Sequence, residues 1–533
     1  MKWLILLAAL LIFLSGCVEE RKQTTPVTVP TATPTQTPLK TTTPTPTTTV
    51  SKRGELEEIS PTKIAEEIPK DYLLKLTPWK LPKGSERNDF YTPQIPRKPE
   101  LDFIINISAN FDGLSTPLVE DFIYIVDGWR VYAYTLDGKQ LWTFDVYENY
   151  KKRIKAYGLG NYLYIGTTSA EKGISLLALD KEKGRVVWEK EINIAGSVSA
   201  LIVSKIVCFG TDYLDPFVMC FEENGTKLWS QKVAGTVKGF AFGDGILFVS
   251  ADYLYAFDET GKLLWKIERS FSTPIYKNGL LIVSSYGYVT AFSKDGTKLW
   301  EKDFKTGEDL KSNPFISASN VALFIPRVFG SKPFELQLVG FDGNLLGNFK
   351  LEDDEIPGFP VVSDEVVLLP VKTEKYGKVY FLWRGKEVIH EIKEEGEEVF
   401  MPTIAVSNGE IFVLFSKSRE KHVLWKLSDK ISPEILNISV TTHGNEVTVS
   451  LTTKDTGSAI HRAMLVYSEN SKWEYKDMDL GRRYFIEPMG GYGFNEEVYV
   501  GKLTVSNILH FYAAVIDNSN NVAKTPVYAY RLT

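Results

Sequence analysis

The stretch Ala256-Phe-Asp-Glu-Thr-Gly-Lys-Leu-Leu-Trp265 decides the fold, because the chain repeats it. A small residue ends an apolar run, a polar turn with a glycine follows, and a tryptophan stands four positions after the glycine. Glycine supplies the positive φ that tight hairpin turns require, and the Leu-Trp pair fits a half-buried strand. Each copy of the phrase therefore predicts a β-hairpin.

The repeat recurs at a period that is typical of β-propellers. The tryptophans of the five clear copies are spaced by 46, 41, 36 and 35 residues, and they are Trp142, Trp188, Trp229, Trp265 and Trp300. A recurrence at roughly 35 to 50 residues with several strands per unit indicates propeller blades. The apolar runs that open a repeat begin near Thr116, Tyr157, Ser199, Gly239, Thr273, Asn313, Gly358 and Met401. Eight starts predict an all-β, eight-bladed propeller, or seven blades if one of the eroded last three repeats is an insertion.

The segment before the first repeat supplies a strand that the last repeat lacks. The eighth repeat ends soon after Trp425, before a fourth strand, and the run from Leu101 to Ala109 reads as a strand. We predict that this run completes the last blade and covers an edge that would otherwise invite pairing with another chain.

Composition limits the class of protein. A chain of 533 residues suggests two or three domains, and 44% hydrophobic with 13% aromatic residues is typical of a folded protein. A formal charge of -6 and a pI near 5.7 argue against a nucleic-acid partner. Three cysteines exclude a disulfide-rich scaffold.

The first residues read as a targeting segment. Lys2 precedes an apolar run from Trp3 to Leu14, shorter than the ~20 residues that span a bilayer. The ending Leu14-Ser15-Gly16-Cys17 resembles the lipobox of secreted lipoproteins, which implies cleavage before Cys17 and lipid on its thiol. The alternative is a plain secretory signal or an uncleaved anchor.

We divide the chain into five segments. These are a lipoprotein signal peptide (1–17), a stalk (18–50), an extended lead-in that packs along the next domain (51–100), a propeller (101–430) and a sandwich (431–533). The stalk is almost all Thr and Pro from Thr24 to Thr49, a composition that cannot bury enough apolar surface to fold. The expected location is the outer face of the cell membrane, with a lipid anchor.

The repeat resembles the pyrroloquinoline-quinone (PQQ)-type propeller repeat, whose phrase is Ala, a few residues, Gly, three residues and Trp. The resemblance implies that the five tryptophans dock between neighbouring blades and are structural. In the quinone dehydrogenases of that family it would also imply an adjacent cysteine pair and an aspartate base beside calcium. Cys208 and Cys220 are twelve residues apart, and no calcium cluster stands out. We therefore predict no catalytic, cofactor-binding or metal-binding residue.

Two kinds of covalent modification are candidates in the propeller and beyond. Cys208 and Cys220 lie on consecutive predicted strands and should face each other across a hairpin, as a disulfide or as two buried thiols. Asn106, Asn224 and Asn437 match the N-glycosylation acceptor pattern, and Asn224, at a hairpin turn, is the favoured site.

Residues 431–533 predict a β-sandwich, because the tryptophan repeat stops and seven short alternating runs follow. The closing run from Phe511 resembles the last hairpin of immunoglobulin-like or fibronectin-III-like modules. Asp517 and the asparagines up to Asn521 fit a polar hairpin turn better than a calcium loop, since Asn tolerates the left-handed conformation of tight turns.

Three functions are compatible with these features. The leading hypothesis is a non-catalytic, lipid-anchored surface protein that binds or scaffolds a protein or glycan partner, for which a related lipoprotein propeller that assists outer-membrane protein assembly is the precedent. The alternatives are a quinone-dependent surface oxidoreductase and a structural envelope protein. A fold that serves many functions does not choose among them.

Overall fold

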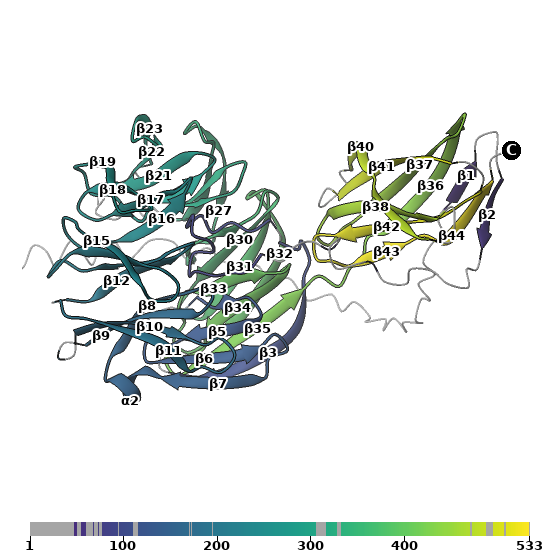
Figure 1. Cartoon of the computed structure of the whole chain (residues 1–533). Coiled ribbons are helices and arrows are strands. Elements are labelled where there is room, and N and C mark those ends of the chain that lie inside the picture. The colour runs from purple at the N-terminus through teal and green to yellow at the C-terminus, as the bar shows by residue number, and fades with distance from the viewer. Residues whose placement is uncertain are drawn as a thin grey trace, which may run out of the picture. The chain divides into compact units, whose positions relative to one another are not determined.

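Figure 1 shows the computed structural model of the chain. The structure describes residues 47–50, 55–59, 68, 73, 77–93, 95–109, 116–169, 171, 173–194, 196–304, 316–327, 332–468, 472–486, 494–505 and 508–531. The predicted signal peptide, Cys17 and most of the predicted stalk lie outside these residues. Among the described residues, no helix is long and apolar enough to cross a membrane.

Residues 100–428 form eight successive antiparallel sheets, numbered here in chain order. Sheet 1 consists of β4 (Leu118–Val119), β5 (Phe122–Val126), β6 (Arg130–Thr135) and β7 (Gln140–Asp145), and sheet 2 of β8 (Arg153–Leu159), β9 (Leu163–Ser169), β10 (Gly173–Leu179) and β11 (Val186–Ile192). Sheet 3 consists of β12 (Val198–Val203), β13 (Val207–Thr211), β14 (Phe217–Phe221) and β15 (Lys227–Lys232). Sheet 4 consists of β16 (Gly239–Gly243), β17 (Ile246–Ser250), β18 (Leu254–Asp258) and β19 (Leu263–Ile267). The short helix α2 (Val146–Tyr150) joins sheets 1 and 2.

The other four sheets continue the pattern. Their strands are, for sheet 5, β20 (Ile275–Lys277), β21 (Leu280–Ser285), β22 (Tyr288–Ser293) and β23 (Lys298–Asp303); for sheet 6, β24 (Ser317–Ala318), β25 (Leu323–Arg327), β26 (Glu335–Val339) and β27 (Leu345–Lys350); for sheet 7, β28 (Ile356–Pro357) and β29 (Val361–Val362), which both pair with β30 (Val366–Lys372), then β31 (Tyr376–Trp383) and β32 (Glu387–Glu395); and for sheet 8, β33 (Thr403–Ser407), β34 (Glu410–Ser416), β35 (Lys421–Ser428) and β3 (Glu100–Ser108). The eight sheets begin close to the eight positions at which the sequence predicts that a repeat opens.

The first strand of each sheet is the inner one. First strands of successive sheets contact each other from β8 through β12, β16, β20 and β24 to β29, and β33 of sheet 8 contacts β4 of sheet 1. The run before the first repeat is β3, and it pairs antiparallel with β35 to become the fourth strand of sheet 8, the arrangement that the sequence predicts.

The repeated phrase forms the hairpin between the third and fourth strands of a sheet. In the copy that opens the sequence analysis, Ala256 lies opposite Trp265, a register shift follows Ala256, and Gly261 has a φ of 82° in the turn. The small residue leaves room for the indole ring across the strand pair, which is why the phrase begins with Ala or Cys.

Each repeat tryptophan contacts the hairpin of the next sheet. The indole Nε1 of Trp229, for example, donates to the carbonyl of Glu259 at 3.0 Å, and a Cβ added to Gly261 would lie 2.5 Å from the Trp229 ring. The other four tryptophans donate in the same way, to the carbonyl oxygens of Lys181, Glu223, Lys294 and Phe341. The tryptophans thus hold neighbouring sheets together.

The C-terminal part is a sandwich of two sheets. One sheet has the order β1 (Thr47–Val50), β36 (Glu434–His443), β37 (Glu446–Lys454), β41 (Phe494–Thr504) and β40 (Asp479–Ile486); the other has β2 (Glu55–Ile59), β44 (Val527–Arg531), β42 (Ile508–Asp517), β38 (Ile460–Ser468) and β39 (Glu474–Asp477), with β43 (Val522–Lys524) beside β42. Buried residues of both sheets, such as Val449 and Phe511, share one core.

Two N-terminal strands in this sandwich differ from the sequence-based expectation. Residues 79–92 of the predicted lead-in do pack along the propeller. For residues 47–59, however, the sequence predicts an unstructured stalk up to residue 50 and then more of this lead-in. Instead, β1 pairs parallel with β36, and β2 pairs antiparallel with β44. Each of the two sheets offers an open edge, and the β-branched Thr and Val residues of β1 suit a strand, so the edges take up the N-terminal segment.

Candidate functional site

Residues 79–92, which we call the mouth segment, cross the carboxyl ends of the inner strands. The segment exchanges main-chain hydrogen bonds of 2.7–3.0 Å with sheets 1, 2, 4, 5, 6 and 7. The partner residues in the sheets are Val119, Leu159, Phe242, Tyr276, Ala318 and Val362. Leu81 packs in the same apolar cluster as Val203 of sheet 3. One end of the set of inner strands is therefore occupied by the protein's own chain.

A buried ion pair fixes the mouth segment. Asp89 Oδ2 lies 3.0 Å from Nζ of Lys277, and the two side chains are only 3% and 2% exposed. The Nδ2 of the neighbouring Asn88 donates to the carbonyl of Pro274 at 2.8 Å. Burial lowers the pKa of Lys277, and the charge of Asp89 opposes that shift. These contacts anchor the segment to sheet 5.

A small cavity lies between the mouth segment and sheets 7 and 8. It has a volume of about 180 Å³, and its lining includes Lys83, Phe90, Phe359 and Met401. Burial lowers the pKa of Lys83 to about 8, and its ammonium lies 5.5 Å from the centre of the Phe359 ring. Small-molecule sites usually have ~300 Å³ or more, so this cavity suits a few waters better than a cofactor.

The opposite ends of the sheets carry the loops between second and third strands. Because each sheet is antiparallel, these loops lie at the other end from the mouth segment. Three of the most exposed large apolar side chains are there: Tyr213 (71%) and Leu214 (60%) after β13, and Tyr286 (59%) after β21. Half-buried Tyr253 occupies the same loop of sheet 4, between them. We call these four residues the loop face.

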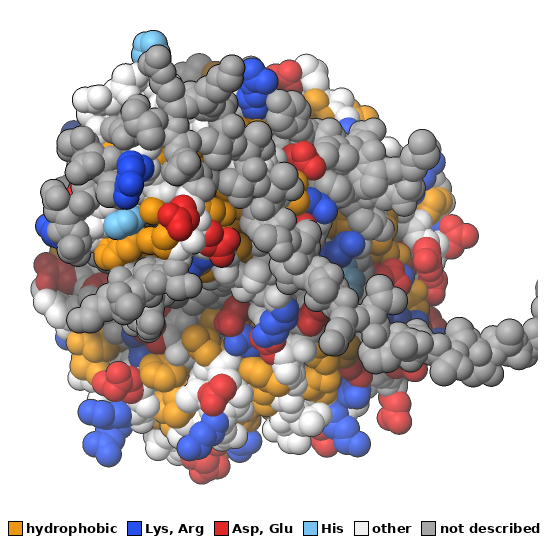
Figure 2. All heavy atoms as spheres, turned by 90° about the vertical axis from the view of Figure 1, so that its right-hand side faces the viewer, with side chains coloured by type: hydrophobic (Ala, Val, Ile, Leu, Met, Phe, Trp, Pro, Cys, Tyr) orange, Lys and Arg blue, Asp and Glu red, His pale blue; other side chains and the backbone are white. Residues whose placement is uncertain are grey.

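Charge does not gather on the surface in view in Figure 2. Acidic and basic side chains are interspersed there among hydrophobic ones, and no large area carries one sign. This pattern fits the formal charge of -6 and gives no indication of a phosphate-binding surface on that side.

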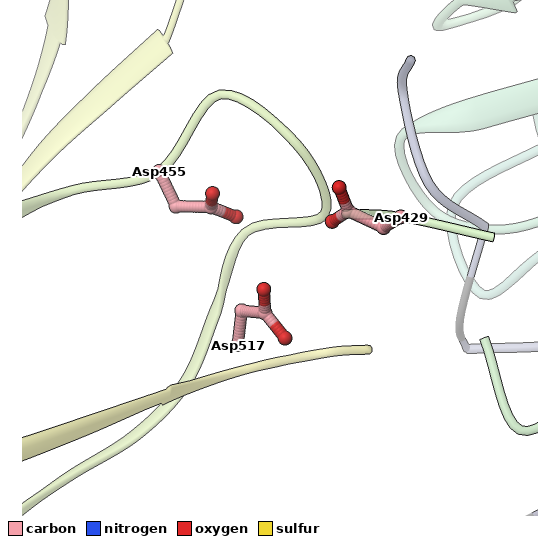
Figure 3. Close-up of side chains that lie close together, drawn as sticks. All are labelled: Asp429, Asp455 and Asp517. Atoms are coloured by element: carbon pink, nitrogen blue, oxygen red, sulfur yellow. The ribbon is translucent and has the colours of Figure 1, made fainter. Parts of the chain in front are cut away.

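A second candidate site is a cluster of three buried aspartates. Asp429 follows β35, Asp455 follows β37 and Asp517 ends β42, and one carboxylate oxygen of each lies within 4.8 Å of the others. Figure 3 shows the three carboxylates converging from separate segments. Their exposures are 4%, 3% and 0%.

Main-chain amides orient all three carboxylates, and Asp455 and Asp517 each accept from two of them. Asp455 accepts from the amides of Gly457 and Ser458 at 3.1 and 2.8 Å, and Asp517 Oδ1 accepts from the amides of Ser519 and Asn521 at 2.8 Å. The second pattern is the polar hairpin turn that the sequence predicts between β42 and β43. Sequence reasoning found that turn but missed the cluster, because its members are distant in sequence.

Burial makes ionisation of Asp429 and Asp517 unfavourable. It raises the pKa of Asp429 to about 6 and, together with the nearby charges of Asp455 and Asp429, raises the pKa of Asp517 to about 7.

The five predicted modification residues lie in four strands and one turn. Cys208 in β13 and Cys220 in β14 are directly opposite, with Cα atoms 4.1 Å apart, and form a disulfide. Asn106 is exposed in β3, Asn224 is exposed in the turn before β15, and Asn437 is half-buried in β36 between β1 and β37. Glycosylation at these three positions stays a prediction. Asn224 is the favoured site because it lies in an exposed turn.

Comparison with known proteins identifies the repeats. Residues 108–213 and 216–348 match the family described as outer membrane protein assembly factor BamB. The match covers less than half of the chain, from the end of β3 to β27, and supports the assignment of these repeats as PQQ-type propeller repeats. No match was found among curated proteins.

Solved structures with similar folds include BamB from Moraxella catarrhalis (17% identity, 62% of this chain and 98% of that one), the computationally designed Ika8 protein (12%; 60% and 99%) and Sqt1 of Saccharomyces cerevisiae (14%; 62% and 99%). All three have a TM-score of 0.46, too low to carry an argument. The fold assignment rests instead on the strand pairing and the repeats.

Proposed function

We propose that this chain is a non-catalytic protein that is lipid-anchored at the outer face of the cell membrane. It binds a protein partner through its loop face. The observation that carries the proposal is the exposure of Tyr213, Leu214 and Tyr286 on loops at the same end of sheets 3 and 5. Tyrosine is enriched in protein interfaces because it offers a large, rigid apolar area with a polar tip. Glycan binding, which also uses aromatic faces, is the competing outcome.

The two ends of the propeller have different roles in this proposal. The mouth segment makes hydrogen bonds to six sheets and leaves a cavity of only about 180 Å³, which favours a structural role for that end. The loop face is then the end that remains for recognition. The similarity to an assembly factor supports a protein partner, and the Leu14–Cys17 stretch supports the anchor.

We also propose that the eight sheets close into an eight-bladed ring. Phe103 of β3 packs against Gly138 in the first hairpin, where an added Cβ would lie 2.9 Å from its ring. Each repeat tryptophan packs in the same way against the glycine of the next hairpin. Lys426 of β35 adds a hydrogen bond of 3.1 Å to the carbonyl of Leu136 in the same hairpin.

The test is photo-crosslinking from the loop face of the full chain in its own cells. A crosslinker at position 214 should give one discrete protein adduct, and Tyr213→Ser with Tyr286→Ser should reduce it about tenfold or more, as loss of central interface aromatics does. The matched control is Leu345→Ser, which removes an equally exposed apolar side chain (61%) from the outer strand β27. An adduct that the loop variant leaves unchanged, or binding of glycans alone, would contradict the proposal.

A further inference from the structure

We propose that Asp429, Asp455 and Asp517 bind one calcium ion, a property beyond the partner binding proposed above. The three carboxylates converge from the connector before β36, the loop after β37 and the turn after β42 (Figure 3). Ligand oxygens within 4.8 Å of one another are close enough together to share one cation, and calcium–oxygen distances are 2.3–2.6 Å.

One carboxylate oxygen in this cluster has no partner in the described structure. Asp429 Oδ1 accepts from the amide of Ile431 at 2.9 Å, but Asp429 Oδ2 is fully buried and accepts no hydrogen bond. The buried hydroxyls of Ser458 and Ser519 make no hydrogen bond of good geometry, although both lie near enough to Asp429 to lower its pKa. A buried polar oxygen without a partner is costly, and a cation would satisfy it.

The loop after β37 is shaped around this unpaired carboxylate. A Cβ on Gly457 would lie 2.4 Å from each of the two Asp429 carboxylate oxygens. Glycine at this position therefore lets the main chain approach the carboxylate closely. The same loop supplies Asp455 and Ser458, so its conformation brings two oxygen-bearing side chains to the carboxylate of Asp429.

Positive charge is missing from the cluster as the structure describes it. No lysine or arginine among the described residues forms an ion pair with these three carboxylates. Arg97 comes near, but its Nη1 donates to the main-chain oxygen of Asp455 at 3.3 Å, and its Nη2 pairs with Glu365 at 2.8 Å. Three buried carboxylates cannot all ionise together without a compensating cation.

The chemistry of the ligand set selects calcium. All candidate ligands are oxygens, from carboxylates and hydroxyls, which hard cations prefer over the nitrogen and sulfur ligands that suit zinc. Magnesium usually keeps several waters and uses one or two carboxylates, whereas calcium accepts six to eight oxygens in irregular geometry. Three carboxylates with two nearby hydroxyls match the ligand set that calcium accepts.

Calcium would reinforce three segments that Asn518 and Asn521 already link. Asn521 Nδ2 donates to the carbonyl oxygens of Asp429 and Ile431 at 3.3 and 3.2 Å, which ties the connector to the turn after β42. Asn518 ties the same turn to the loop after β37, since its main-chain amide donates to the carbonyl of Ala459 at 2.9 Å and its Nδ2 to that of Ser458 at 2.8 Å. A bound ion would link the connector to this loop through the carboxylates of Asp429 and Asp455. It would therefore stabilise the sandwich at the place where the chain enters it from sheet 8.

The experiment is calorimetry on the full chain after EDTA treatment, with calcium chloride or magnesium chloride added. We expect one calcium per chain, a dissociation constant no weaker than about 1 mM, weaker magnesium binding, and a melting temperature that rises with calcium concentration. Absence of calcium binding and of any thermal shift at about 10 mM calcium would overturn the proposal.

Two substitutions separate a lost ligand from a damaged fold. Asp429→Asn removes a buried charge and should leave the metal-free melting temperature unchanged or higher, while calcium affinity falls about tenfold or more. Asp479→Asn, at an exposed aspartate of β40, should bind calcium as the wild type does. Equal calcium binding by Asp429→Asn and the wild type would overturn the assignment of these ligands.

Discussion

At the scale of single residues, the contact between neighbouring sheets depends on a tryptophan and a glycine from successive repeats. Gly261 has a φ of 82° and lies against the ring of Trp229. The glycine is thus required twice, once for its backbone conformation and once for the space that the indole ring fills.

Gly261→Ala should lower the stability of the propeller by more than the strain of its backbone alone. A positive φ costs alanine about 1 kcal/mol, and overpacking against the ring adds about 1–3 kcal/mol. Gly279→Ala is the matched control, because Gly279 has a similar φ of 75° and an added Cβ there meets nothing within 4 Å. Thermal unfolding of both variants measures the difference, and equal losses would argue against the tryptophan contact.

Lys83 provides a pH-dependent test of the cavity at the mouth segment. Burial lowers its pKa from 10.5 to about 8, so the folded protein releases this proton at lower pH than the unfolded chain. The unfolded state then binds more protons between about pH 8 and pH 10.5, and this group adds stability as pH rises through that window. Lys83→Met should therefore raise the melting temperature at pH 7, and its advantage should shrink to near zero by about pH 10.5. An advantage that is independent of pH would contradict the burial of the charged amine.

At the scale of elements, the mouth segment acts as a shared strand-like partner for six sheets. Its bonds are to the main chain, so its sequence carries little information on where it docks. The pair Asp89–Lys277 supplies the specific contact, since both ends are buried.

Removal of one partner of the Asp89–Lys277 pair should lower the free energy of unfolding more than removal of both partners. Asp89→Ala leaves Lys277 buried without its counter-ion and should cost about 3–5 kcal/mol of unfolding free energy. The double variant Asp89→Ala with Lys277→Met should recover a large part of that loss, because no buried charge remains. Chemical denaturation of the wild type, the two single variants and the double variant gives the coupling, and additive losses would show that the pair is not a buried ion pair in solution.

At the scale of the whole molecule, the chain contributes to its sandwich from both ends. The strands β1 and β2 come before the propeller, and β36 to β44 come after it. The stalk that the sequence predicts therefore has less free length than its composition suggests, since residues 47–50 and 55–59 lie in the two sheets.

Membrane attachment is expected to depend on Cys17. In cells, Cys17→Ser should move the protein from the membrane fraction to the soluble fraction and abolish incorporation of labelled fatty acid, because the thiol is the predicted lipid acceptor. The propeller and the sandwich should melt as in the wild type. Retention of the variant in the membrane would favour an uncleaved apolar anchor.

The sequence by itself determined the all-β class, the repeat period and the starts of the eight sheets. It could do so because the phrase around Trp265 is local, and its turn, strand and docking contacts lie within one repeat and the next hairpin. The pairing of β3 with β35 was also predictable, since the last repeat lacks a fourth strand.

Only the tertiary structure decided how the mouth segment crosses the inner strands, which sheets receive β1 and β2, and where Asp429, Asp455 and Asp517 meet. Main-chain hydrogen bonds at the mouth segment and at the sheet edges are open to almost any residue, so composition does not reveal them. The aspartates come together because three connections end at one edge of the sandwich, and each aspartate alone looks like an ordinary turn residue.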